Sequence, residues 1–134
     1  MKISLSTSSV NPMNVHVAFE AAQLLGYDGI ELMVSPNKLT QNLDYMKNLV
    51  DKTGVPITSV HAPTLLLCKF VWGTDPQGKL VKSVEFADQV GATSVVVHPP
   101  FKNNHYADHF IDVANKLSKD SGVDVAIENM FPWV

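Results

Sequence analysis

Arginine is absent from this chain of 134 residues, and the formal net charge is −3. The forked guanidinium of arginine grips phosphates and base edges best, so its absence disfavours nucleic acid as a partner. The single cysteine, Cys68, excludes an internal disulfide. No apolar run approaches the roughly 20 residues that span a bilayer, and the N-terminus lacks an apolar signal core. We therefore expect one globular domain in the cytoplasm, without a membrane partner.

Short runs rich in Ile and Val alternate with amphipathic stretches, which is typical of repeated βα units. Strands are expected at Ile3 to Leu5, Ile30 to Leu32, Ile57 to His61, Ser94 to His98 and Val123 to Glu128. Helices are expected from Asn11 and Pro12 to Gly26, from Leu39 to Gly54, from Thr74 or Asp75 to Gly91, and over Tyr106 to Gly122. This order predicts an α/β fold with a parallel sheet.

The chain has about half of the roughly 250 residues that a closed (β/α)₈ barrel needs. We therefore expect residues 1–134 to be the N-terminal part of one such barrel domain, a truncated five-stranded parallel half-barrel with outer helices. Its open strand edges and an apolar inner face would favour a homo-oligomer. The rival fold is a doubly wound, flavodoxin-like sheet. The turn from Ser6 to Asn11 carries no glycine-rich phosphate loop, so nucleotide binding has little support.

Four of the apolar runs end on a side chain that can bind a metal or move a proton: Glu31, His61, His98 and Glu128. The carboxyl ends of parallel strands face one crevice, so these side chains are expected to converge there. Two neutral imidazoles and a carboxylate form a competent ligand set for Zn²⁺ or Mn²⁺. A strand-end histidine also serves as a hydrogen-bonded structural group, and Glu31 is equally compatible with a structural bond to a backbone amide.

Two further features have competing interpretations. The connection from Ala62 to Thr74 is unusually apolar and is expected either to pack over the core or to form a substrate lid, which makes Trp72 a candidate substrate contact. Cys68 lacks a nearby base in the sequence and is expected to be a small buried hydrophobe. His105 and His109 are four residues apart on one predicted helix, but they lack the His-Glu-x-x-His context of a metal site.

Four short motifs occur in register with the βα repeat. They are Gly26-Tyr27-Asp28-Gly29-Ile30-Glu31-Leu32, Val60-His61-Ala62-Pro63, Val96-Val97-His98-Pro99-Pro100 and Ile127-Glu128-Asn129-Met130. In order and spacing the whole chain resembles the xylose isomerase-like TIM barrel superfamily, in particular its sugar phosphate isomerase/epimerase branch. Relatives of that branch include endonuclease IV, which cuts DNA at abasic sites.

The resemblance implies roles for the strand-end residues. Glu128 matches the fifth-strand glutamate that binds the divalent metal (Mn, Mg or Zn) and is the candidate catalytic residue. His61 and His98 match histidines that bind zinc in the endonuclease branch and line the substrate site in the isomerase branch. Glu31 matches a supporting glutamate near the substrate. The family's later strands have no counterpart here, so metal occupancy is expected to be partial or absent.

The function that the resemblance implies for the parent protein is metal-dependent isomerisation or epimerisation of a small sugar or sugar phosphate. The 134-residue chain itself is expected to show little or no turnover. A first alternative is a zinc phosphodiesterase of the endonuclease IV type acting on abasic DNA. A second alternative is a non-catalytic assembly or binding module whose open strand edges recruit another chain.

Overall fold

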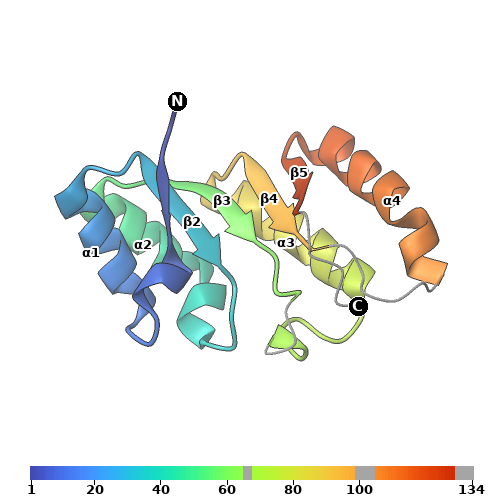
Figure 1. The fold of residues 1–134 in the computed structure, drawn as a ribbon, viewed down its shortest axis with the longest axis horizontal. Helices are drawn as coiled ribbons and strands as arrows, with labels where there is room; N and C mark the ends of the chain where they lie inside the picture. Colours follow the sequence, from blue (N-terminus) through green and yellow to red (C-terminus); the bar gives the residue numbers. More distant parts are fainter. Residues whose placement is uncertain (65–67, 99–104, 129–134) are drawn as a thin grey trace.

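The computed structural model describes residues 1–64, 68–98 and 105–128, with the backbone alone at 105–108. Strands and helices alternate along the chain (Figure 1). The strands are β1 (Ser4–Ser6), β2 (Gly29–Met33), β3 (Ile57–His61), β4 (Ser94–Val97) and β5 (Asp124–Ile127). The α-helices are α1 (Val15–Leu25), α2 (Leu43–Thr53), α3 (Pro76–Val90) and α4 (His105–Ser121), and the short 3₁₀ helices are η1 (Thr7–Val10) and η2 (Lys38–Gln41).

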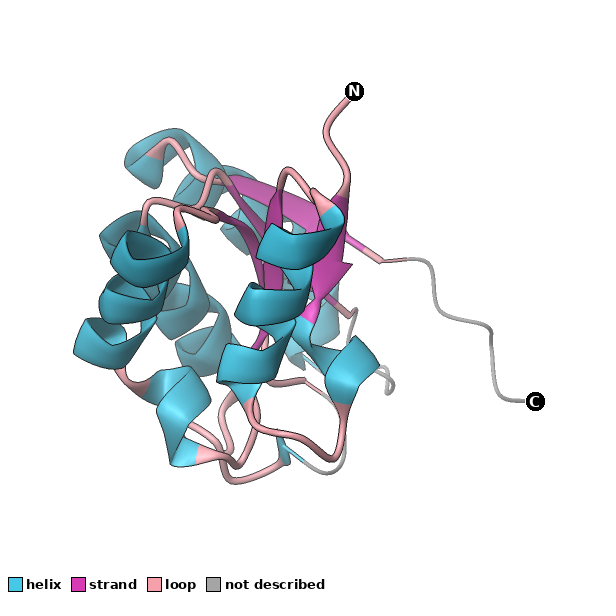
Figure 2. Ribbon diagram, turned by 90° about the vertical axis from the view of Figure 1, so that its left-hand side faces the viewer, coloured by secondary structure: helices cyan, strands magenta, loops and turns pink. Residues whose placement is uncertain are grey.

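The five strands form one parallel sheet in the order β1-β2-β3-β4-β5. Strands that pair in sequence order keep their connecting helices on one face of the sheet. Figure 2 shows the helices gathered to one side of the strands. This arrangement confirms the predicted half-barrel and excludes the flavodoxin-like alternative, whose strand order reverses.

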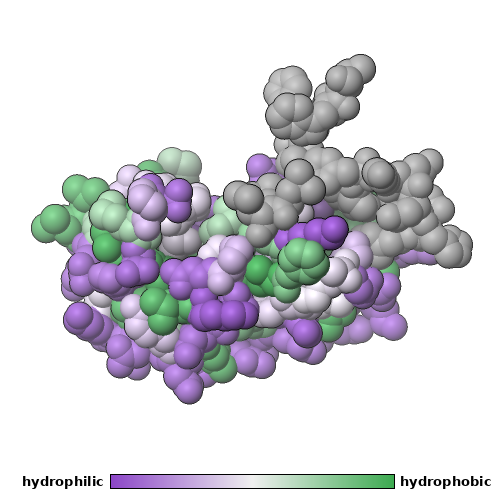
Figure 3. All heavy atoms as spheres, turned by 90° about the horizontal axis from the view of Figure 1, so that it is seen from below, coloured by the Kyte–Doolittle hydropathy of each residue, from purple (hydrophilic) through white to green (hydrophobic). Residues whose placement is uncertain are grey.

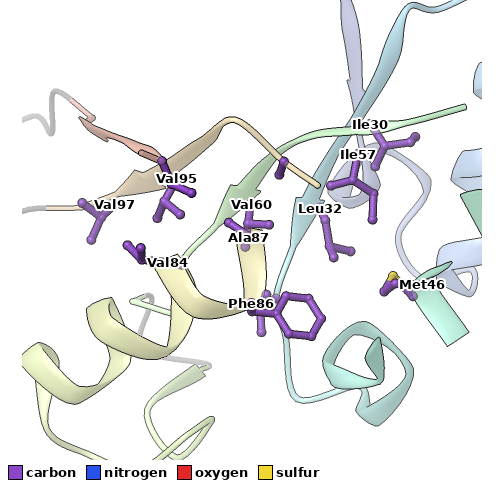
Figure 4. Packing of buried hydrophobic residues seen from close by; sticks show 14 of the residues in the cluster. Ile30, Leu32, Met46, Ile57, Val60, Val84, Phe86, Ala87, Val95 and Val97 are labelled. Carbon is purple, nitrogen blue, oxygen red and sulfur yellow. The ribbon is translucent and has the colours of Figure 1, made fainter. Parts of the chain in front are cut away.

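The core lies between the sheet and its helices. Alternate strand residues such as Ile30, Leu32, Val60 and Val95 are fully buried on this face. They pack against side chains from the helices, as Figure 4 shows for Met46 of α2 and Val84, Phe86 and Ala87 of α3. Burial of each large apolar side chain contributes about 1.5 to 3 kcal/mol, so this face supplies most of the stability of the sheet.

The opposite, inner face of the sheet is more polar than the sequence analysis expected. Residues paired across neighbouring strands point to the same side. The pairs Ser6 with Glu31, Ser59 with Ser94, and Ser94 with Asp124 therefore place hydroxyls and carboxylates on the inner face. Met33, Val96 and Ala126 are apolar exceptions, of which the first two are partly buried and Ala126 is exposed. The expectation of an apolar inner face is wrong, because the serines on these strands alternate with the valines that point toward the helices.

Gly29 allows β3 to lie close to β2 on the inner face. A Cβ atom at Gly29 would collide with the side chain of Thr58 and approach the carbonyl oxygen of Pro56 to 3.0 Å. Thr58 uses this space to hydrogen-bond Ser4 at 2.7 Å and to donate to the carbonyl of Ile30 at 3.0 Å. The pairing of β2 with β3 shifts register at this point. The absence of a side chain at Gly29 thus allows one hydroxyl, that of Thr58, to link β1, β2 and β3.

The side chains of Asn42 and Asp75 cap α2 and α3, and the starts of α1 and α2 differ from expectation. The helix α1 begins at Val15 rather than at Asn11 and Pro12, because Thr7–Val10 forms a separate 3₁₀ turn first. Leu39 likewise lies in η2, and α2 begins at Leu43 because Asn42 Oδ1 accepts a hydrogen bond from the backbone N–H of Tyr45. The expected cap of α3 is confirmed: Asp75 Oδ2 accepts from the N–H of Gly78 at 2.7 Å.

The connection between β3 and α3 packs over the core where it is described. Cys68 and Val71 are buried, whereas the side chain of Phe70 is 79% exposed. Residues 65–67 lie outside the described residues, as do Pro99 and Pro100 after β4. In the part of the chain that is described, no helix combines the length and the apolar character that a bilayer crossing requires.

We propose that the open sheet edges drive self-association. Among the described strands, β1 and β5 pair on one side only, and an unpaired edge readily accepts another strand. Ile127 of β5 is 42% exposed. Light scattering at micromolar concentration should report a dimer or a larger assembly, and Ile127→Lys should shift it toward the monomer. Ile111→Lys, at an exposed position of α4, is the control and should leave the mass unchanged. A stable monomer of the unaltered chain would contradict the proposal.

Candidate metal centre

Three of the predicted site residues lie at adjoining strand ends. His61 is the last residue of β3, and His98 and Glu128 directly follow β4 and β5. Backbone hydrogen bonds continue past the strands, from Ala62 N–H to the carbonyl of Val96 and from Glu128 N–H to the carbonyl of Val97. The ladder therefore holds all three residues at the carboxyl edge, on the inner face of the sheet.

The two imidazoles converge on one carboxylate oxygen. His61 Nε2 lies 3.1 Å and His98 Nε2 3.0 Å from Glu128 Oε2. The rings meet edge to face, with centroids 4.8 Å apart and planes at 84°. Both histidines are buried, whereas the side chain of Glu128 remains 48% exposed. The cluster is thus rigid on the histidine side and open to a ligand on the carboxylate side.

The hydrogen bonds of His61 constrain where its ring protons lie. Its Nδ1 lies 3.1 Å from the carbonyl oxygen of Ala62. A carbonyl oxygen only accepts, so Nδ1 carries a hydrogen. Nε2 donates to Glu128 when it also carries a hydrogen, and it presents a lone pair that a metal ion can bind when it does not. Ligand histidines in metal sites are held by the same kind of bond from the other ring nitrogen.

Electrostatics keep Glu128 ionised. The hydrogen bond with His61 is the main cause that lowers the pKa of the Glu128 carboxyl. Partial burial opposes this shift, and the hydrogen bond and charge of His98 reinforce it. The Nδ1 atom of His98 is buried without a hydrogen-bond partner in the described part of the chain. The site therefore brings an anionic carboxylate oxygen close to the Nε2 atoms of His61 and His98. A divalent cation could bind all three atoms.

The donor set fits a divalent metal. His61, His98 and Glu128 offer ligand atoms that lie within 4.8 Å of one another. Among the described side chains, those of residues 1–64, 68–98 and 109–128, they are the only such group of three or more His, Cys, Asp or Glu. Two imidazole nitrogens and a carboxylate oxygen suit Zn²⁺ or Mn²⁺ and leave coordination positions for water or a substrate oxygen.

The other two predicted site residues lie apart from this group. Glu31 is on the inner face of β2. It pairs with Ser59, which precedes His61 by two residues on β3. Its side chain forms no hydrogen bond or ion pair with any described residue. Trp72 packs on Phe86 of α3, with ring centroids 5.6 Å apart, and so belongs to the helix side of the sheet. Substrate-binding roles for Glu31 and Trp72 stay predictions.

Cys68 is a small buried residue, as the sequence analysis predicted. Its thiol points toward the carbonyl of Val34 at 3.7 Å, and burial raises its pKa. The pair of His105 and His109 includes a side chain, that of His105, which lies outside the described part of the structure.

One buried cation, Lys79 of α3, was not predicted from the sequence. Its side chain is 5% exposed and donates to two backbone carbonyls of the connection between β3 and α3. The helical pattern of Leu80, Val84 and Ala87 gave no signal for it, because a lysine beside an apolar stripe usually lies in solvent.

Removal of the carboxylate tests the metal site. Glu128→Gln keeps the shape of the side chain but removes its charge. We expect the affinity for Zn²⁺ to fall by at least the roughly 10- to 100-fold that loss of an outer-shell partner costs. Calorimetric titration measures the change. Glu31→Gln is the matched control, since it removes a carboxylate from the same face without touching the histidines, and its affinity should equal that of the unaltered chain. Equal affinity in the Glu128→Gln variant would remove Glu128 from the site.

Comparison with known proteins agrees with this fold. The family model described as xylose isomerase-like TIM barrel matches residues 19–134. An uncharacterized protein of Mycobacterium leprae is 48% identical over 134 residues, which are 99% of this chain and 48% of that protein. The chain thus spans about half the length of this relative.

Solved structures share the architecture at low sequence identity. The 3-keto-D-glucoside 4-epimerase YcjR of E. coli superposes with a TM-score of 0.67 and 18% identity, over 97% of this chain and 56% of the epimerase. The IolI protein, whose structure has a bound zinc atom, superposes with a TM-score of 0.68 and 18% identity, over 95% of this chain and 51% of IolI. The family match over most of its length establishes that this chain belongs to the xylose isomerase-like TIM barrel family.

Proposed function

We propose that this chain supplies the first half of the divalent-metal site of a sugar or sugar-phosphate isomerase or epimerase. One observation carries the proposal: the convergence of His61, His98 and Glu128 at the carboxyl edge of the sheet. Membership of the family and the fold shared with a sugar epimerase support it. Because the chain covers 48% of its mycobacterial relative, we assign the activity to a longer protein in which residues 1–134 form the N-terminal part of one barrel.

The chemistry of the site follows from its ligands. A divalent ion bound by His61, His98 and Glu128 would polarise a sugar carbonyl and so acidify the neighbouring C–H bond. Glu128 is suited to be a ligand rather than the base, because the hydrogen bond with His61 lowers the pKa of its carboxyl. A general base works best with a pKa near the working pH. A group other than these three residues would therefore move the proton.

The same ligands would also suit a zinc phosphodiesterase that acts on abasic DNA. The formal net charge of −3 and the absence of arginine in this half weigh against a polyanionic substrate. A small sugar is therefore the preferred substrate class, and cleavage of abasic DNA becomes an outcome of the test. A role as a non-catalytic assembly module would leave both substrates unchanged.

Proton exchange tests the function. The longer protein that contains this sequence, loaded with Mn²⁺, Mg²⁺ or Zn²⁺, should exchange a substrate α-proton with deuterated solvent, as measured by NMR on a panel of ketoses and aldoses. The 134-residue chain should exchange little or none. In the longer protein, Glu128→Gln should lower the rate on the order of 100-fold, the size of a lost electrostatic contact to the transition state. Asp124→Asn removes a carboxylate at the amino end of the same strand, β5, and serves as the control that should leave the rate unchanged.

Two results would overturn this proposal. Nicking of an abasic-site duplex without any sugar exchange would establish the phosphodiesterase instead. Exchange that persists unchanged in the Glu128→Gln variant would show that the cluster of His61, His98 and Glu128 does not support the reaction.

A further inference from the structure

A cavity of about 610 Å³ lies at the carboxyl edge of the sheet, between the segments that follow β1 and β2. Cys68, from the connection between β3 and α3, also contributes to its lining. Its volume is within the range of about 300 to 1,000 Å³ that is typical of small-molecule sites. Figure 3 looks onto this end of the molecule and shows hydrophobic residues interspersed among hydrophilic ones. The cavity is thus large enough for part of a sugar.

The cavity adjoins the metal centre through the sheet. Met33 lines the cavity and is the ladder partner of His61. Neighbouring strands lie about 4.8 Å apart, so a ligand that reaches the Nε2 atom of His61 can extend over Met33 into the cavity. This continuity indicates that one molecule could occupy both places.

The lining of the cavity is neutral. None of the described residues that line it carries a charge, and Met13, Val15 and Met33 are apolar. Two of its hydroxyls are already committed to the backbone: Thr7 Oγ1 accepts from Met33 N–H, and Thr40 Oγ1 donates to the carbonyl of Asn37. The lining therefore combines apolar contact area with neutral polar side chains, those of Ser8, Asn11, Ser35 and Asn37.

A phosphate group does not suit this lining. A phosphate monoester carries about two negative charges at neutral pH and is usually bound by arginine, lysine or several backbone N–H groups. The N-terminus of α1 borders the cavity at Val15. A helix end contributes only about half a positive charge, which does not balance two negative ones. The charge of a phosphorylated sugar would remain largely unpaired here.

We propose that this cavity binds the non-reacting end of an unphosphorylated sugar, and that it selects neutral sugars over sugar phosphates. The assignment of the reacting end to His61, His98 and Glu128 rests on the proposed function. The selection against phosphate rests on the neutral lining alone.

Methionine methyl groups report directly on the cavity. Met13 and Met33 line it, whereas Met46 is fully buried in the core. In the 134-residue chain with ¹³C-labelled methionine methyl groups, D-fructose should shift the signals of Met13 and Met33 and leave Met46 in place. D-fructose 6-phosphate should require at least a tenfold higher concentration for the same shift. No turnover is needed, so shifts without proton exchange would refute the proposed function but leave this inference intact.

A matched pair of lysine substitutions tests the charge argument. Ser8 lines the cavity and Ser9 beside it does not, although both side chains are exposed in η1. Ser8→Lys should strengthen binding of D-fructose 6-phosphate about tenfold, which corresponds to one new ion pair of about 1.4 kcal/mol. Ser9→Lys should change it little. The inference fails if the phosphate binds the unaltered chain as tightly as fructose does, or if neither sugar shifts Met13 and Met33.

Lys79 supports a second, independent inference. Its Nζ atom donates to the carbonyl oxygens of Pro63, at 3.0 Å, and Cys68, at 2.7 Å. The described residues provide no carboxylate partner for it, and burial lowers its pKa. A buried cation without a carboxylate partner is costly, and the two carbonyl dipoles offset part of that cost. The lysine thereby links Pro63 to Cys68.

One of the two carbonyls that Lys79 binds belongs to Pro63, which lies close to the metal centre in the sequence. Pro63 follows Ala62, whose carbonyl accepts the hydrogen of His61 Nδ1. The same carbonyl also accepts from the N–H of Thr64 at 2.8 Å. We infer that Lys79 is a positioning residue: it holds the turn at Ala62 and Pro63 and thereby keeps His61 in the tautomer that presents Nε2 to a metal.

The tautomer of His61 tests this role, and His98 is an internal control. Lys79→Met keeps the apolar stem but removes the three donors. In ¹⁵N NMR of the metal-free chain at mildly alkaline pH, the Nδ1–H form of His61 should give way to a mixture, while the signals of His98 stay unchanged. Zinc affinity should fall about tenfold, the cost of a lost outer-shell contact.

Other lysine variants complete this experiment. Lys79→Arg should restore part of the Nδ1–H form of His61 and part of the zinc affinity, because it restores a cationic donor. Lys82→Met removes an exposed lysine from the same helix, whose Nζ reaches only the carbonyl of Trp72 at 3.5 Å, and should change neither. If Lys79→Met does not fold, Lys79→Gln provides one amide donor in its place and carries the same expectation. An unchanged His61 tautomer in a folded Lys79 variant overturns the inference.

Discussion

The backbone register between β3, β4 and β5 is the constraint on which the site depends. Residues 67 positions apart, His61 and Glu128, meet because Val96 pairs with both His61 and Ala126. A slip of one residue would turn every side chain of a strand to the other face. It would expose Val60 and Val95, which are now fully buried. The apolar packing against the helices therefore fixes the register, and the register places the ligands.

This dependence explains how much of the fold and of the site the sequence could predict. The alternation of βα units predicts the strand order, and residues at the carboxyl ends of parallel strands share one edge. His61, His98 and Glu128 could therefore be placed together from their positions alone. The burial of Cys68 was likewise predictable, because an isolated cysteine in an apolar segment usually packs as a hydrophobe.

Features that depend on how a connection folds back could not be predicted. Trp72 lies against Phe86 of α3, a contact that depends on how the described residues before α3 fold against that helix. Lys79 is buried because the same segment covers it, although its sequence neighbours give no indication of this. The cavity combines segments after β1 and β2 with Cys68, and no single stretch of sequence contains its pattern.

The helix face of the sheet contributes to stability, and the inner face carries the candidate site. The helix face contains the buried valines, leucines and isoleucines, and its packing does not require any particular residue on the inner face. The inner face can therefore carry serines, carboxylates and histidines at little cost in stability, because these groups remain partly hydrated or bond to one another. An apolar inner face would have left no room for the shared carboxylate of Glu128. The polar character of that face, which the sequence analysis did not anticipate, is what allows two buried imidazoles to meet an ionised oxygen at the edge of the sheet.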